Sequence, residues 1–163
     1  MRILGIDPGI GRAGWGVVEV QGAKFKALSF GCIETEAEMS MEKRLEKLFN
    51  EISKIIKTEK PDEAAIEELF FNTNAKTALT VGQARGVLLL TLSQKNLPIG
   101  TYTPLQVKIA LAGYGRAEKS QVGHMVKTIL GLSSIPKPDD AADGLAIALT
   151  HAFSRKVNKL TFN

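Results

Sequence analysis

The stretch Ile3-Leu4-Gly5-Ile6-Asp7-Pro8-Gly9 decides the fold, because a short apolar run there ends in an acid and a turn. Such a run is typical of a buried strand, and Asp-Pro-Gly is typical of the turn that ends one. We therefore expect Asp7 at a strand end. Residues 14–20 and 24–33 flank Gln21-Gly22-Ala23 and predict two more strands, paired as a hairpin. The first third of the chain thus predicts a three-stranded antiparallel meander.

The apolar pattern changes after Ser40. Apolar residues then recur at helical spacing as far as Ile56, which predicts an amphipathic helix that ends before Lys60-Pro61. The short run Glu63-Ala64-Ala65-Ile66-Glu67 predicts a strand that again delivers an acid at its end. Further helices are predicted over residues 74–94, 119–130 and about 139–153, and a further strand over residues 97–102. This order predicts an α/β protein with a five-stranded mixed sheet, antiparallel first and parallel later, flanked by helices.

The composition is that of an ordinary globular protein. The chain has 163 residues, of which 44% are hydrophobic and 23% charged, so we expect one domain over residues 1–163 that ends in a short tail. Cys32 is the only cysteine, which excludes an intrachain disulfide and a zinc site built from cysteines. We see no signal peptide and no membrane-length apolar segment, so we expect a cytoplasmic protein. The net charge of +4 fits a polyanionic partner as well as it fits an ordinary surface.

Four acids suggest a metal site. Asp140 and Asp143 share one face of the last predicted helix. Taken alone, this pair can simply stabilise a helix start, and Asp7 can be a turn residue. Together with Glu67, however, they arrive from separate elements at element ends, where sites on α/β sheets usually form. Clustered carboxylates must share protons or bind cations. Carboxylate oxygens without histidine or cysteine ligands favour Mg²⁺ or Mn²⁺. A pair of such ions can promote hydrolysis of a phosphodiester bond.

Six segments carry a family resemblance. In chain order they are Gly5-Ile6-Asp7-Pro8-Gly9, Ala65-Ile66-Glu67, Gly82-Gln83-Ala84-Arg85-Gly86, Gln106-Val107-Lys108, Ala117-Glu118-Lys119-Ser120-Gln121-Val122 and Asp140-Ala141-Ala142-Asp143. Together they closely resemble the RuvC family of bacterial Holliday junction resolvases. The match runs in register from about residue 2 to residue 153.

The resemblance implies a ribonuclease H-like fold, a homodimer, Mg²⁺, and paired symmetric nicks across a four-way DNA junction. From the chemistry of clustered carboxylates we expect two ions in each active site. The resemblance also implies Asp7, Glu67, Asp140 and Asp143 as the catalytic, metal-binding set, although some relatives carry His where Asp140 stands. The Ala-Ile-Glu match selects Glu67 over the adjacent Glu68. Family analogy also suggests RuvA and RuvB as partners.

The DNA contacts also follow from family position. Lys108 and Lys119 match phosphate-contacting positions, and Lys119 is also expected to support catalysis by stabilising phosphate charge. The resemblance suggests Phe70 for stacking on exposed bases, and the sequence leaves open whether Phe70 or the adjacent Phe71 faces DNA. Further DNA-contact candidates are Arg85, Lys76 and Arg116, for which solvated surface residues are the alternative.

Three rival hypotheses remain open at this point. An actin-like or sugar-kinase-like ATPase also begins with an Asp-Gly hairpin, but it needs two similar domains. A junction-binding protein without catalysis would need a broken carboxylate set. A related, usually shorter resolvase-like family lacks the match over residues 117–122.

Overall fold

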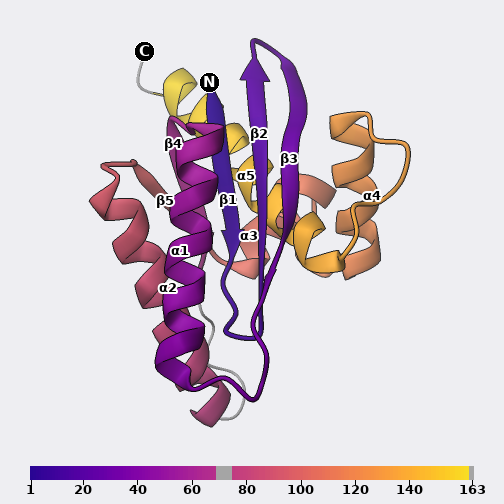
Figure 1. Cartoon of the computed structure of the whole chain (residues 1–163). Helices are drawn as coiled ribbons and strands as arrows, with labels where there is room; N and C mark the ends of the chain where they lie inside the picture. The colour runs from indigo at the N-terminus through magenta and orange to yellow at the C-terminus, as the bar shows by residue number, and fades with distance from the viewer. Residues whose placement is uncertain (69–74, 162–163) are drawn as a thin grey trace.

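The computed structural model describes residues 1–68 and 75–161 of the chain. In that part of the chain the strands are β1 (Arg2–Asp7), β2 (Arg12–Gln21), β3 (Lys24–Glu34), β4 (Glu63–Glu67) and β5 (Ile99–Tyr102). The helices are α1 (Met41–Glu59), α2 (Ala75–Gln94), α3 (Pro104–Ala112), α4 (Lys119–Leu130) and α5 (Asp139–Thr161). Figure 1 shows their arrangement.

The strands form one five-stranded sheet with the order β3-β2-β1-β4-β5. β1 pairs antiparallel with β2, and β2 pairs antiparallel with β3. β4 pairs parallel with β1, and β5 pairs parallel with β4. The predicted α/β class and the mixed sheet, antiparallel first and parallel later, are therefore confirmed.

Helices cover both faces of this sheet (Figure 1). On one face, Ile6 of β1 belongs to the same buried cluster as Ile52 of α1 and Leu88 of α2. On the other face, Ile3 of β1 belongs to a cluster with Leu145 of α5, which α3 and α4 complete. Successive side chains of a strand point to opposite faces, so the apolar β1 fills both layers. The central position of β1 follows directly from its uninterrupted apolar sequence.

Glycines allow α5 to approach the sheet closely. A Cβ atom at Gly14 of β2 would overlap the carbonyl oxygen of Asp140. A Cβ atom at Gly144 of α5 would lie 2.5 Å from the Cα of Trp15, closer than real Cβ contacts allow. Only glycine at these positions lets the first turns of α5 lie against β2. This contact brings the aspartates at the start of α5 to the end of the sheet where β1 finishes.

The sequence analysis did not predict α3. Its nine residues are mostly apolar and show no helical stripe, so periodicity did not reveal it. Its end signals are clear nonetheless. Thr103 and Gln106 form a capping box, Pro104 follows the cap, and Gly113 ends the helix in the left-handed conformation at φ 82°.

Two further findings concern the helices. The last helix passes its predicted end at Phe153 and continues to Thr161, because residues 154–161 contain neither glycine nor proline. Within residues 1–68 and 75–161, no helix combines the length and the apolar character that a membrane crossing requires.

Candidate active site

Asp7 and Glu67 lie at the carboxyl ends of two neighbouring parallel strands. The register pairs Ile6 of β1 with Ile66 of β4, so the two acids follow at the same level of the sheet. The next residue, Glu68, is exposed, and its amide donates a 2.8 Å hydrogen bond to the carbonyl of Tyr102. Of the two adjacent glutamates, Glu67 is therefore the one that lies beside Asp7.

The start of α5 supplies the other two acids, and each has a cationic partner. The Nζ of Lys119, the first residue of α4, lies 2.6 Å from Oδ2 of Asp143. The Nε of Arg12, the first residue of β2, lies 3.1 Å from Oδ2 of Asp140. Both aspartate side chains are about three-quarters buried, so these ion pairs lie at the boundary with water.

Three of the four predicted carboxylates open onto one hollow of about 220 Å³, which we call the catalytic hollow. Its lining residues are Asp7, Glu67, Pro104, Val107, Lys108, Lys119, Val122 and Asp143. The two lysines with the clearest family match thus share this hollow with the acids. Asp140 does not line it and lies on the Arg12 side instead.

The acids strongly influence one another. Burial, together with the nearby charges of Glu67, Asp143 and Asp140, raises the pKa of Asp7 to about 8 against the opposing charge of Lys119. Burial, followed by the charge of Asp143, raises the pKa of Glu67 to about 7. Burial also raises the pKa of Asp143, although Lys119 opposes this. The cluster therefore retains protons near neutral pH unless cations balance its charge.

The donor set fits a hard divalent cation. It offers carboxylate oxygens alone, brought close enough to raise one another's pKa, and such ligands suit Mg²⁺ or Mn²⁺ rather than zinc. As the described side chains stand, no three or more acidic, histidine or cysteine groups are arranged to hold a metal ion. Lys119 and Arg12 currently bind Asp143 and Asp140. Both aspartate carboxylates are thus paired with cations in this structure.

Comparison with known proteins identifies the family to which this chain belongs. The family model described as "Crossover junction endodeoxyribonuclease RuvC" matches residues 3–151. The chain belongs to the RuvC family.

The RuvC relatives match over nearly their full length. The RuvC of Caldicellulosiruptor saccharolyticus is 54% identical over 155 residues, which cover 94% of this chain and 93% of that protein. The structure of Thermus thermophilus RuvC is similar with a TM-score of 0.89 and 39% identity, covering 97% of each chain. A second structure, of T. thermophilus RuvC in complex with Holliday junction substrate, gives a TM-score of 0.88 and 37% identity, covering 96% of each chain.

Membership of the RuvC family fixes the class of enzyme. The chain is a crossover junction endodeoxyribonuclease, a hydrolase of phosphodiester bonds in DNA, and the ribonuclease H-like fold implied by the resemblance is confirmed. A RuvC nuclease depends on a divalent metal ion. The ATPase and the non-catalytic alternatives find no support in these matches.

The remaining DNA-contact candidates from the RuvC resemblance have different surroundings. Arg116 is exposed between α3 and α4. Arg85 of α2 is half-buried, and its Nε donates a 3.0 Å hydrogen bond to the carbonyl of Glu67, so it supports the end of β4. Lys76 belongs to α2, but its side chain lies outside the described part of the structure, as do Phe70 and Phe71.

The sequence analysis missed Arg12. Its guanidinium joins Asp140 at 3.1 Å and Glu34 of β3 at 3.2 Å. The contact links the start of β2 with the start of α5, which are far apart in the sequence. The only local signal is a cation five residues after Asp7, on the strand that pairs with β1.

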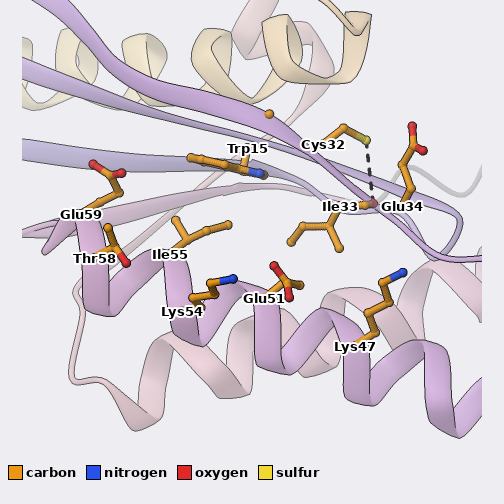
Figure 2. Close-up of a pocket in the computed structure, with 11 residues that line it drawn as sticks. Trp15, Cys32, Ile33, Glu34, Lys47, Glu51, Lys54, Ile55, Thr58 and Glu59 are labelled. Carbon is orange, nitrogen blue, oxygen red and sulfur yellow. Dashed lines mark hydrogen bonds between the residues drawn. The ribbon is translucent and has the colours of Figure 1, made fainter.

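A larger hollow of about 440 Å³ lies between β3 and α1 (Figure 2). Trp15 and Ile55 contribute apolar surface to it, while Lys47, Glu51 and Lys54 of α1 line its charged side. None of the site residues predicted from the RuvC resemblance lines it. The candidate active site is therefore chosen by its clustered carboxylates and not by the size of the hollow.

Proposed function

We propose that this chain resolves Holliday junctions by hydrolysing two phosphodiester bonds, placed symmetrically across the junction, and leaves ends that a ligase can join. The observation that carries the proposal is the catalytic hollow, where Asp7, Glu67 and Asp143 meet beside Lys108 and Lys119. The Holliday junction substrate bound to the similar T. thermophilus RuvC supports junction DNA as the ligand of this chain.

Asp7, Glu67, Asp140 and Asp143 serve in this proposal as the metal ligands. Two Mg²⁺ ions in each site, with Mn²⁺ as a substitute, would activate the attacking water and stabilise the leaving 3′ oxygen. The raised pKa values of Asp7 and Glu67 mean that these two groups must release protons as ligands form. Asp140 lies outside the catalytic hollow and joins the set by leaving Arg12.

The two lysines of the catalytic hollow have different roles towards the DNA phosphates. Lys119 lies against Asp143, so its ammonium is close to the reacting group and stabilises the negative charge that develops there. Lys108 lines the same hollow from α3 and holds a phosphate of the bound strand. Further contacts are assigned to Phe70, by stacking, as the family resemblance suggests. Arg85, Lys76 and Arg116 are additional candidates because of their positive charge.

The chain acts in this proposal as a homodimer. The site offers one carboxylate cluster in each copy, and two symmetric nicks require two such sites facing a junction with two-fold symmetry. RuvA and RuvB, as family analogy suggests, are the partners that present the junction. The proposed setting is the cytoplasm, with residues 1–163 acting as a single nuclease domain.

The test is cleavage of a synthetic four-way junction with Mg²⁺, with mapping of the nicks on all four strands. We expect nicks in two opposite strands at symmetric positions, and ends that ligase seals. A linear duplex with the same sequence serves as the control and should remain uncut under the same conditions. Equal cleavage of the linear duplex would refute the proposal, and so would an activity that requires ATP.

A further inference from the structure

Three large apolar side chains close to the catalytic hollow are exposed to solvent. Leu105 and Ile109 of α3 and Tyr114 of the following turn are exposed to 55%, 49% and 47%. A Cβ atom at Gly115 would overlap Cδ1 of Leu105 and lie 3.8 Å from Cγ1 of Ile109, so these two side chains adjoin the turn that carries Tyr114. We call these three residues the α3 patch.

Core packing does not account for the α3 patch. Val107 and Leu111 are the buried residues of α3, and both belong to the core cluster that also contains Val122 and Leu145. Leu105 and Ile109 belong to neither described core cluster, because they lie on the opposite side of this helix. Exposure of leucine and isoleucine in one place is costly enough to indicate a contact surface.

The α3 patch shares helix α3 with the catalytic hollow, although none of its three residues lines the hollow. Val107 and Lys108 of the same helix line that hollow together with Asp7 and Glu67. Lys108 also lies three residues after Leu105, a spacing that places the two side chains on one side of a helix. Lys108 therefore joins the lining of the hollow to the patch along α3.

Cations border the patch as well. Lys108 lies on its inner side, and Arg116 follows Gly115 directly and is exposed. No ion pair joins either cation to a carboxylate in the part of the chain that the structure describes. Both charges are thus available to phosphates on either side of an apolar surface.

We propose that the α3 patch binds the base and sugar faces of a DNA strand at the point where the junction's strands exchange, while Lys108 and Arg116 hold the adjoining phosphates. A regular duplex hides its base faces, whereas a strand that is unstacked at a crossover exposes them to an aromatic ring such as Tyr114. Leucine and isoleucine are side chains that proteins press against opened base steps. This inference rests on the proposed function, and it adds a reason why the nuclease prefers a junction to a duplex.

A protein partner fits the α3 patch less well. A stable protein interface buries about 800 Å² on each side. Three partly exposed side chains flanked by unpaired cations provide only a small apolar centre. The same arrangement suits a single nucleotide step.

The test measures the dissociation constants of junction and linear duplex without divalent metal, so that binding is separated from cutting. We expect Tyr114→Ala to weaken junction binding roughly tenfold and duplex binding by less than about twofold, since one base stack is lost. Tyr114→Phe should bind the junction as wild type does. The double variant Leu105→Ser/Ile109→Ser should show the same selective loss as Tyr114→Ala.

Phe49→Ala is the matched control, because Phe49 is a partly exposed aromatic residue of α1, on the other face of the sheet. It should leave junction binding unchanged. A 2-aminopurine base placed at the crossover supplies a direct signal: its fluorescence should fall when the wild-type protein binds, and this drop should be lost in Tyr114→Ala.

Several results would overturn the inference. Unchanged junction binding by Tyr114→Ala is one, and an equal loss on junction and duplex is another. A change of sedimentation coefficient in Leu105→Ser/Ile109→Ser without a junction-specific loss would assign the patch to contacts between copies of the chain. If the wild-type protein fails to cut the junction, the proposed function itself fails. If the wild-type protein cuts the junction and the patch variants bind it as tightly as wild type does, this inference alone fails.

Discussion

Lys119 has two neighbours that define its role, namely the carboxylate of Asp143 and the open space of the catalytic hollow. The ion pair with Asp143 is short, at 2.6 Å, and the ammonium also lowers the pKa values of Asp7 and Glu67. Burial lowers the pKa of Lys119 itself, but the hydrogen bond to Asp143 and the charges of Asp143, Asp140 and Asp7 outweigh it and raise that pKa. Lys119 therefore carries a positive charge beside the acids of the catalytic hollow.

We expect Lys119→Ala to reduce junction cutting roughly a hundredfold, because preorganised charge at a reacting group is typically worth that much. Junction binding should weaken by less than about threefold, since Lys119 is one of several phosphate contacts. Gel-shift and single-turnover cleavage assays on the same junction measure the two effects. Lys137→Ala is the control, because Lys137 is an exposed lysine that pairs with Asp139 and does not line the catalytic hollow. A loss confined to affinity would reduce Lys119 to a plain phosphate contact.

Asp7 makes the metal-free protein sensitive to pH. Its pKa is about 8 in the folded chain, against an ordinary value of 3.8. At a pH between these two pKa values, the Asp7 carboxyl is mostly protonated in the folded chain and mostly ionised in the unfolded chain. It follows that the contribution of Asp7 to stability is most favourable below about pH 4 and is lost as the pH rises towards 8.

In EDTA, Asp7→Asn should accordingly stabilise the protein at pH 8. After allowance for solvent screening, the gain should be on the order of 1–2 kcal/mol, or a few degrees in melting temperature. The gain should shrink as the pH falls towards 4, where the Asp7 carboxyl of the unfolded wild-type chain also becomes protonated. Thermal melts of both proteins across this range measure the effect. A variant that melts below wild type at pH 8 would show that the carboxylates do not strain the metal-free fold.

The contact between α5 and the sheet decides where two of the four acids lie. Sequence periodicity predicted the strand ends and the start of α5, and thus the elements that carry Asp7, Glu67 and Asp143. It did not predict that Gly14 and Gly144 let the helix touch β2, since that contact depends on tertiary packing. The ion pair between Arg12 and Asp140 was missed for the same reason. The choice of Glu67 over Glu68 came from the family resemblance, because strand alternation only shows that one of the two can join the cluster.

Gly14→Ala should destabilise the protein by about 1–3 kcal/mol, because the added methyl overlaps the backbone of Asp140 and must displace α5. Junction cutting should fall with it, since the displacement moves Asp140 and Asp143. Gly86→Ala is the matched control: a Cβ atom at this α2 position meets nothing within 4 Å, and alanine is the better helix former. Urea unfolding compares the two. If Gly14→Ala is as stable and active as Gly86→Ala, the close approach of α5 does not position the site.

The fold and the chemistry of the chain agree because its parallel strands end where its last helix begins. The α/β order was readable from the sequence, whereas α3 was not, although its side of the molecule carries Lys108 and the α3 patch. The same end of the sheet thus combines a cluster of acids with neighbouring cations and exposed apolar side chains. An enzyme with this arrangement is expected to bind DNA through groups other than those that cut it.

The separation of binding from cutting is measured by Asp7→Asn on a four-way junction with Mg²⁺. Asp7 is the acid whose pKa all three other carboxylates raise, so it lies at the centre of the cluster. We predict that the variant binds the junction within about threefold of wild type, because the phosphate contacts remain. Cutting should fall by roughly a thousandfold or more, because a metal ligand is lost. Cutting at the wild-type rate would contradict the assignment of the carboxylate site.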